Sequence, residues 1–326
     1  RSSFSVSVRD LIISSLASKI ASFFLASAFF IAFTYFSAKL ESEGGDTARG
    51  TLNFLSAKDG KPYYITEDGS FYRAYIYVGG AHSCDSTDDP MQLYYAAKAF
   101  GHFQNMLADF DASTLFETIE RFHDTPNRFN NFKIALEKDT AGRAASIPDD
   151  IKFVLDHSEV CSYIMDKIKE GDLPLRVTHN DTKLNNILMD HETGEPVCII
   201  DLDTIMPGSV LFDFGDAIRF GASSALEDET DLSKVYMRED AFEAFAKGFV
   251  SGLEGSLSET EIMELPMGAL VITLETGIRF LTDYLNGDTY FKIHYPTHNL
   301  DRARNQFKLV SDMEARLPEM REIVKK

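Results

Sequence analysis

The sequence predicts an α+β protein with a short, strand-rich first part and a long, mostly helical second part. Aromatic segments flank the turn Glu67-Asp68-Gly69, which is typical of a β-hairpin. From residue 90 onward apolar side chains recur at helical spacing. A second hairpin, with Gly194 at its turn, joins the apolar runs 187–189 and 197–200. Polar residues at the mouth of this hairpin are the candidate functional site.

Composition limits the classes of function. The 326 residues, 44% of them hydrophobic, are enough for a buried core in one or two domains. A formal net charge of −19 argues against sequence-independent nucleic-acid binding. The cysteines Cys84, Cys161 and Cys198 are odd in number and far apart. They indicate a reducing, cytoplasmic location rather than a disulfide framework or a zinc site.

The first forty residues differ in composition from the rest. Ile20–Phe36 carries no charge and is at the short limit for a membrane span. A signal peptide would use Arg1 and Arg9 as its basic region, and a membrane anchor would stop at Lys39. The interpretation we favour is a truncated or mistranslated start. A membrane partner is therefore not expected unless this segment is native.

Helices are predicted along most of the second part. Phe100, Phe103, Leu107 and Phe110 form a stripe at 3.6-residue spacing, which predicts a helix face against the core. The further predicted helices cover residues 115–121, 129–137, 148–170, 238–253 and 267–285.

The polar loop before the second hairpin has the spacing of a kinase catalytic loop. His179 to Asn186 fits H-x-D-x-x-x-x-N. Asp181 is the candidate base for an acceptor hydroxyl, and Lys183 is placed to balance charge on the transferred phosphoryl group. Asn186 and Asp201 offer hard oxygen ligands for Mg²⁺.

Two features near this loop have competing interpretations. Strand alternation would place Asp203 on the same face as Asp201, so that it could touch the substrate. Asp213-Phe214-Gly215 spells the kinase metal motif, but it follows an irregular segment. We interpret Asp213 as a structural acceptor that ties the loop down, with a metal contact as the alternative. For the whole stretch the alternative is a polar surface hairpin.

Several segments resemble one family. HNDTKLNNIL (179–188), CIIDLDTIMPGS (198–209) and LFDFGDAIRFGAS (211–223) are similar to the aminoglycoside-phosphotransferase and choline-kinase superfamily of small-molecule kinases. Within it, the longer runs 101–133, 275–291 and 295–310 resemble the N-acetylhexosamine 1-kinases. The resemblance covers about residues 61 to 309.

The resemblance implies a protein-kinase-like two-lobe fold with an incomplete or atypical small lobe. Residues 1–40 would be the atypical hydrophobic N-terminus, 41–78 a remnant of the nucleotide-binding small lobe, and 79–326 the catalytic large lobe. The implied cofactors are ATP and Mg²⁺. The implied acceptor is a hexosamine, phosphorylated on the anomeric hydroxyl of N-acetylglucosamine or N-acetylgalactosamine.

The resemblance also implies binding residues. Backbone groups of Ala74, Tyr75, Ile76 and Tyr77 would meet adenine, although an ordinary sheet edge is equally compatible with these letters. Glu275, Arg279 and Asp283 lie four residues apart and so share one face of a predicted helix. Either this face is exposed and salt-bridged, or Arg279 enters the cleft and positions the sugar together with Asp203 and, as a neighbour, Tyr290.

The sequence departs from the family pattern in the small lobe. No G-x-G-x-x-G phosphate loop occurs, and neither Lys19 nor Lys39 lies in a convincing strand. We therefore expect weak or no turnover from this chain. Two alternatives stay open: a kinase of the same fold for choline, methylthioribose or an aminoglycoside, and a catalytically dead sugar-binding protein.

Overall fold

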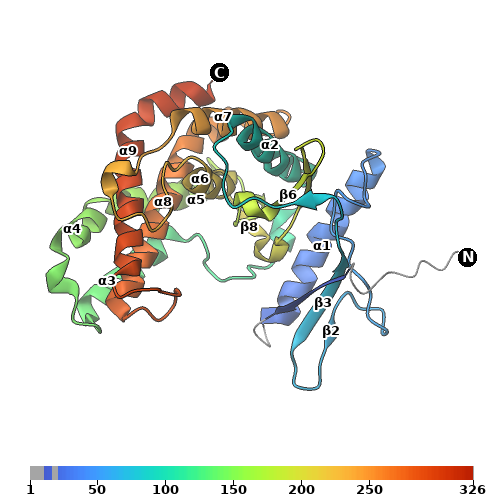
Figure 1. Ribbon diagram of the computed structural model, residues 1–326, viewed down its shortest axis with the longest axis horizontal. Helices are drawn as coiled ribbons and strands as arrows, with labels where there is room; N and C mark the ends of the chain where they lie inside the picture. The colour runs from blue at the N-terminus through green and yellow to red at the C-terminus, as the bar shows by residue number, and fades with distance from the viewer. Residues whose placement is uncertain (1–10, 17–20, 326) are drawn as a thin grey trace, which may run out of the picture.

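The computed structural model describes residues 11–16 and 21–325, with side chains described from residue 32 onward. The chain forms two lobes (Figure 1). The small lobe comprises β1 (Leu11–Leu16), α1 (Ala21–Ser42), β2 (Tyr64–Ile65) and β3 (Phe71–Ile76). Its antiparallel sheet has the order β1-β3-β2, so β3 is the central strand. The mixed helix-and-strand architecture confirms the predicted α+β class.

Helix α1 joins the two lobes through an apolar cluster. Ala32 is fully buried, and Phe36 packs against Phe103 of the large lobe with ring centroids 5.3 Å apart. Leu202, which follows the hairpin of residues 187–200, belongs to the same cluster. The predicted boundary at residue 40 thus falls inside a helix that ends at Ser42.

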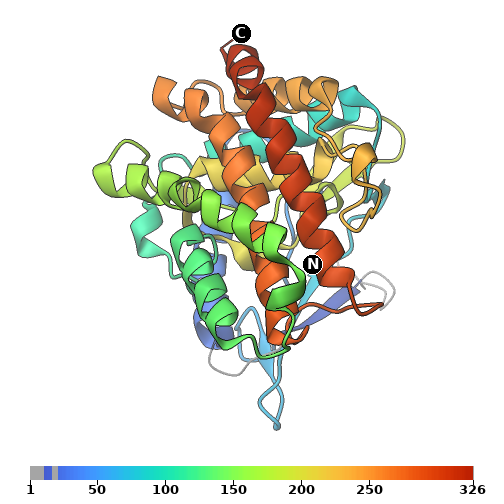
Figure 2. The ribbon, with the colours of Figure 1, turned by 90° about the vertical axis from the view of Figure 1, so that its left-hand side faces the viewer.

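The large lobe is mostly helical. Its helices are α2 (Pro90–Met106), α3 (Thr125–Lys138), α4 (Pro148–Asp156), α5 (Ser158–Glu170), α6 (Val210–Gly221), α7 (Glu239–Gly252), α8 (Glu259–Asn286) and α9 (His298–Val324). Figure 2 shows α8 and α9 running side by side, and α2 packs along α7. The core lies between these helices.

Two predicted helices differ in the structure. Residues 115–121 are not helical. The Arg121 N–H donates to the Glu117 carboxylate instead of a backbone carbonyl, and Arg121 adopts a φ of 55°, outside the helical region. Residues 148–170 form two helices that meet at His157. There the ring of His157 contacts the carbonyl oxygen of Phe153 at 2.6 Å and stacks on the Phe153 ring.

The strands of the large lobe frame the catalytic loop. β5 (Arg176–Thr178) pairs with β8 (Met206–Gly208), and β6 (Ile187–Asp190) lies between β4 (Ala81–His82) and β7 (Pro196–Ile199). The loop 179–186 connects β5 to β6. Residues 200–205 connect β7 to β8, so both polar segments cross between the same two small sheets.

The letters Asp213-Phe214-Gly215 lie inside α6, where each residue has a packing role. Phe214 contacts the ring of Phe249 at 5.5 Å in the core. A Cβ on Gly215 would lie 2.4 Å from the Gly268 carbonyl oxygen, so only glycine allows α6 and α8 to approach this closely. The motif therefore builds a helix contact.

Among the described residues one helix, α8, is long and apolar enough to cross a membrane. Its apolar stretch is 89% buried within the fold, which is typical of a core helix.

Candidate active site

The catalytic loop is anchored by a buried histidine. His179 has no exposed surface, and its ring lies edge-on to Phe100 and Phe103 of α2. Its Nε2 contacts the Ile200 carbonyl oxygen at 3.0 Å. His179 thus connects the loop to the residue before Asp201, which brings the two polar segments together.

Asp213 holds the loop from α6. Its carboxylate accepts the backbone N–H groups of His179 at 2.9 Å and Asn180 at 2.6 Å, and the Gln104 side chain at 2.5 Å. Burial raises the pKa of Asp213, although the neighbouring His179 and these hydrogen bonds oppose the shift. The predicted role of Asp213 as a structural acceptor agrees with these contacts.

Asp181 is presented to the cleft by a left-handed residue. Asn180 has a φ of 65°, which asparagine tolerates better than most residues. The Asn180 side chain accepts from Thr178 and donates to the Thr204 carbonyl oxygen at 2.8 Å. The side chain of Asp181, which follows, is 25% exposed. The loop therefore fixes its own backbone and leaves the carboxylate accessible.

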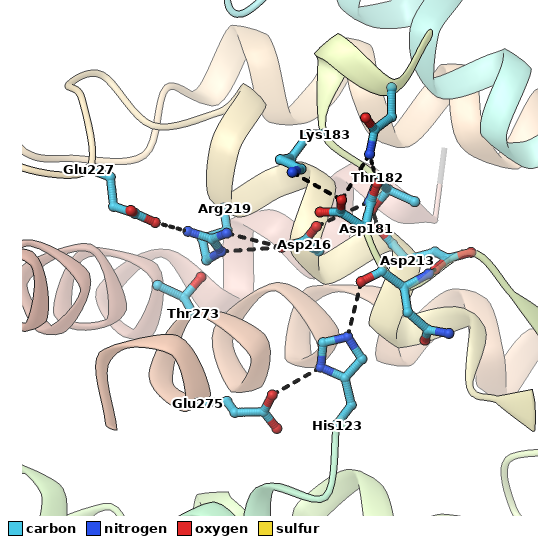
Figure 3. A network of polar contacts seen from close by, with 12 residues as sticks. His123, Asp181, Thr182, Lys183, Asp213, Asp216, Arg219, Glu227, Thr273 and Glu275 are labelled. Atoms are coloured by element: carbon cyan, nitrogen blue, oxygen red, sulfur yellow. Dashed lines mark hydrogen bonds and ion pairs between the residues drawn. The ribbon is translucent and has the colours of Figure 1, made fainter. Parts of the chain in front are cut away.

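Lys183 and Asn186 both contact the Asp181 carboxylate, as Figure 3 shows for Lys183. Lys183 Nζ lies 3.0 Å from Asp181 Oδ2, and Asn186 Nδ2 donates to the same oxygen at 2.9 Å. The predicted spacing thus brings three of the candidate residues into direct contact. Because the Asn186 amide nitrogen is used here, its amide oxygen is left for another partner.

Asp201 and Asp203 do not lie on a strand. β7 ends at Ile199, Asp201 adopts a φ of 58°, and residues 202–204 form a 3₁₀ turn. The prediction from strand alternation is therefore wrong in its geometry. The two carboxyl groups are still close enough for the charge of Asp203 to raise the pKa of Asp201.

Three aspartates make this part of the cleft strongly negative. Loss of hydration, followed by the charges of Asp181 and Asp203, raises the pKa of Asp201. A divalent cation would remove this repulsion, and carboxylate and amide oxygens suit Mg²⁺. Asp201 and the Asn186 amide oxygen therefore fit the predicted metal role. Among the described side chains, no group of three or more His, Cys, Asp or Glu residues forms a metal site by itself.

The small lobe contributes a cation to the cleft. Arg73, on the central strand β3, forms an ion pair with Asp203 and is only 10% exposed. Its guanidinium also lies over the Phe54 ring at 5.6 Å. Asp203, predicted to contact substrate, is thus already engaged across the lobes. The sequence signal for Arg73 is a charged residue on the inward face of an aromatic strand.

The segment predicted to meet adenine is largely paired within the sheet. β1 pairs with one edge of β3, and on the other side the Ala74 carbonyl accepts from Leu55 while the Ile76 N–H donates to Asn53. Tyr75 is part of this strand. Tyr77 lies beyond it, exposed, in the connection between the lobes. Tyr77 is therefore the best placed of the four for a ligand.

Arg279 and Tyr290 come together away from the catalytic loop. Both line a cavity of about 150 Å³, which contains no residue of the loop. The Arg279 guanidinium lies between the rings of Phe122 and Phe291, 5.6 and 5.5 Å from their centroids. A larger cavity, of about 510 Å³, is lined by Lys183.

The exposed, salt-bridged alternative for α8 is wrong. Glu275 is fully buried, and Asp283 is 4% exposed. Asp283 accepts the backbone N–H groups of residues 289–291 and so shapes the loop that carries Tyr290. Arg279 is half-buried.

His123 lies below the catalytic loop (Figure 3). It contacts Glu275 of α8 and the Asn180 carbonyl. The signal that could have found this pair is Glu275 itself, an acid within the apolar run of α8, because a buried carboxylate requires a partner.

The fold and this site define a small-molecule phosphotransferase with a kinase-like architecture. The chain belongs to the phosphotransferase enzyme family, whose model matches residues 49–246, more than half of the chain. The predicted superfamily is thereby confirmed.

Solved structures share this fold. An aminoglycoside phosphotransferase from Alicyclobacillus acidocaldarius is 14% identical, with a TM-score of 0.60 over 96% of this chain and 87% of that one. A microcompartment-associated aminopropanol kinase is 15% identical, with a TM-score of 0.59 over 95% and 86%. The amicoumacin kinase hAmiN, in complex with AMP-PNP and Ca²⁺, is 14% identical, with a TM-score of 0.50 over 97% and 80%.

Proposed function

We propose that the protein transfers the γ-phosphoryl group of ATP to a hexosamine, on the anomeric hydroxyl of N-acetylglucosamine or N-acetylgalactosamine. The observation that carries the phosphotransfer is the contact of Lys183 and Asn186 with the Asp181 carboxylate, beside Asp201. The use of ATP is supported by a structural neighbour in complex with AMP-PNP. The sugar is supported by the resemblance of residues 101–133, 275–291 and 295–310 to the N-acetylhexosamine 1-kinases.

In this proposal the chain's own residues orient the reactants. Asp181 accepts the proton of the attacking hydroxyl. Lys183 stabilises negative charge on the phosphoryl group, and Asn186 with Asp201 holds the metal. The metal held there would supply positive charge to offset that of the ATP phosphates. Arg279 and Asp203 position the sugar, with Tyr290 beside Arg279.

The small lobe supports one alternative, a catalytically dead sugar-binding protein. β1, the strand that pairs with β3, has the sequence LIISSL and carries no lysine. Arg73 of β3 supplies a cation to the cleft from this sheet. A catalytically dead sugar-binding protein would retain sugar binding and fail to bind Mg-ATP.

The aromatic residues around Arg279 favour a sugar over a quaternary amine. A quaternary ammonium ligand calls for an open cage of aromatic faces. Here the rings of Phe122 and Phe291 are already covered by the Arg279 guanidinium. The guanidinium in turn offers donors to hydroxyl or phosphate oxygens.

The experiment is incubation at high enzyme concentration with Mg-ATP and a panel of hexosamines, choline, methylthioribose and an aminoglycoside. Phosphorus NMR then identifies the phosphorylated atom. We expect slow formation of a hexosamine 1-phosphate that Asp181→Asn abolishes. Phosphorylation of choline or of an aminoglycoside alone would overturn the substrate assignment, and sugar binding without Mg-ATP binding would overturn the catalytic one.

A second measurement locates the sugar. Arg279→Ala should raise the KM for sugar about tenfold, because it removes one to two hydrogen bonds to the sugar. The KM for ATP should be unchanged. Gln306→Leu is the comparison, because Gln306 lines the larger cavity beside Lys183 and its Oε1 has no hydrogen-bond partner among the described residues. If only Gln306→Leu raises the KM for sugar, the sugar site is the larger cavity and not the cavity that contains Arg279.

A further inference from the structure

His123 lies between two hydrogen-bond acceptors. Its Nδ1 is 2.9 Å from Glu275 Oε1, and its Nε2 is 3.4 Å from the Asn180 carbonyl oxygen (Figure 3). A carboxylate and a carbonyl only accept hydrogen bonds. Both contacts are therefore satisfied together only when both ring nitrogens carry a hydrogen, which is the imidazolium form.

The surroundings hold this pair in place. His123 is 8% exposed, and its ring packs against Phe122 and Phe212. Thr125 donates to the other Glu275 oxygen at 2.6 Å. Burial raises the pKa of Glu275, but the charge and hydrogen bond of His123, together with the charge of Arg279 and the hydrogen bond from Thr125, outweigh it, so the pKa is lowered overall.

The contact of His123 is made to the peptide group that leads into Asp181. The N–H of this same peptide, from Asp181, points to His179 Nδ1 at 3.3 Å. One imidazole therefore holds the carbonyl of the Asn180–Asp181 peptide, and another holds its N–H. A change in either torsion that flanks this peptide, ψ of Asn180 or φ of Asp181, would swing the Asp181 side chain.

We propose that His123, doubly protonated and held by Glu275, is a positioning residue that sets the orientation of the base Asp181. This inference rests on the proposed phosphotransfer. It assigns a function to two residues that lie 152 positions apart in the chain and do not contact Lys183 or Asn186 in the described hydrogen bonds.

Two neutral substitutions separate this role from simple support of the fold. The amide nitrogen of His123→Gln superposes on Nε2 and retains a donor toward Asn180. The amide nitrogen of His123→Asn superposes on Nδ1 and retains a donor toward Glu275. Both remove the charge. Only the asparagine loses the contact with the catalytic loop.

We expect His123→Asn to lower kcat about 10- to 100-fold, as for a misplaced catalytic group, with KM for both substrates unchanged. His123→Gln should stay within about threefold of wild type, because it keeps the donor that orients the peptide. Glu275→Gln should resemble His123→Gln in kcat, because Thr125 donates to the amide oxygen, the amide nitrogen can donate to Nδ1, and the neutral imidazole keeps a hydrogen on Nε2 for the Asn180 carbonyl. Equal losses in both His123 variants, or the reverse order, would overturn the proposal.

His157 provides the matched control. Its ring nitrogens also face a backbone carbonyl and a carboxylate, those of Phe153 and Glu314. It lies between α4 and α5, away from the catalytic loop. His157→Gln should leave kcat unchanged, and a loss similar to that in His123→Asn would show a general effect of such substitutions.

Amide hydrogen exchange tests the same claim without turnover. The Asp181 N–H should exchange faster in His123→Asn than in His123→Gln when both variants have the same melting temperature. If wild type phosphorylates no acceptor, the proposed function fails and this exchange difference still decides the positioning role. Equal exchange in the two variants would refute it.

Discussion

Replacing Asp213 by alanine should destabilise the protein strongly. The buried carboxylate accepts two backbone N–H groups, at 2.9 and 2.6 Å, and the Gln104 amide at 2.5 Å. Alanine leaves both backbone donors buried without an acceptor, at about 1–3 kcal/mol each. Part of this is offset, because the raised pKa of Asp213 shows that burial disfavours its charged form. We expect a loss of about 3 kcal/mol in the free energy of unfolding.

The assay is urea unfolding at pH 7 followed by far-ultraviolet circular dichroism, with kcat measured in parallel. Asp213→Asn keeps one acceptor oxygen and should lose about 1–2 kcal/mol, the cost of one buried hydrogen bond. Asp111→Ala removes an exposed carboxylate that accepts the Ser113 N–H and should cost about 1 kcal/mol. If Asp213→Ala unfolds within 1 kcal/mol of wild type, the anchoring role of Asp213 is refuted.

Three further outcomes are expected. Asp201→Asn should raise the Mg²⁺ concentration that gives half-maximal turnover about tenfold or more; an unchanged Mg²⁺ requirement would remove Asp201 from the metal site. Arg73→Met should lower stability by about 2 kcal/mol, because it leaves Asp203 without its partner across the lobes; an unchanged urea midpoint would show that the ion pair contributes nothing. Glu275→Gln should be about 3 kcal/mol less stable than wild type at pH 7, as measured by urea titrations across pH. Because the folded pKa of Glu275 lies below its ordinary 4.5, this carboxylate stabilises the fold above about that pH, and its contribution disappears as pH falls through the lower folded value. If the difference in unfolding free energy between wild type and Glu275→Gln does not shrink in acid, the lowered pKa of Glu275 is contradicted.

The catalytic loop could be predicted because its information is local. The spacing from His179 to Asn186 is set by one loop between two strands that are consecutive in the chain. The contact of Asp181 with Asn186 therefore followed from counting residues. The same counting placed Asp201 directly after the hairpin. It failed for the orientation of Asp201 and Asp203, because the strand ends two residues early and a left-handed residue follows.

The partners of the loop could not be predicted because they come from distant segments. Asp213 reaches His179 from α6, Gln104 reaches Asp213 from α2, and Glu275 reaches His123 across 152 positions. Helical periodicity indicated that α2 and α8 face the core, but not which polar residue would meet which. Arg73 was hidden for the same reason, since its partner Asp203 belongs to the other lobe.

The central claim is that Asn186 and Asp201 share one divalent cation beside Asp181. It is tested most directly by crystals grown with Mn²⁺ and a non-hydrolysable ATP analogue, with anomalous scattering used to locate the metal. We predict a peak between the Asn186 amide oxygen and the Asp201 carboxylate, within about 2.5 Å of each. A peak at Asp213, or a nucleotide-bound metal that contacts neither Asn186 nor Asp201, would contradict the account.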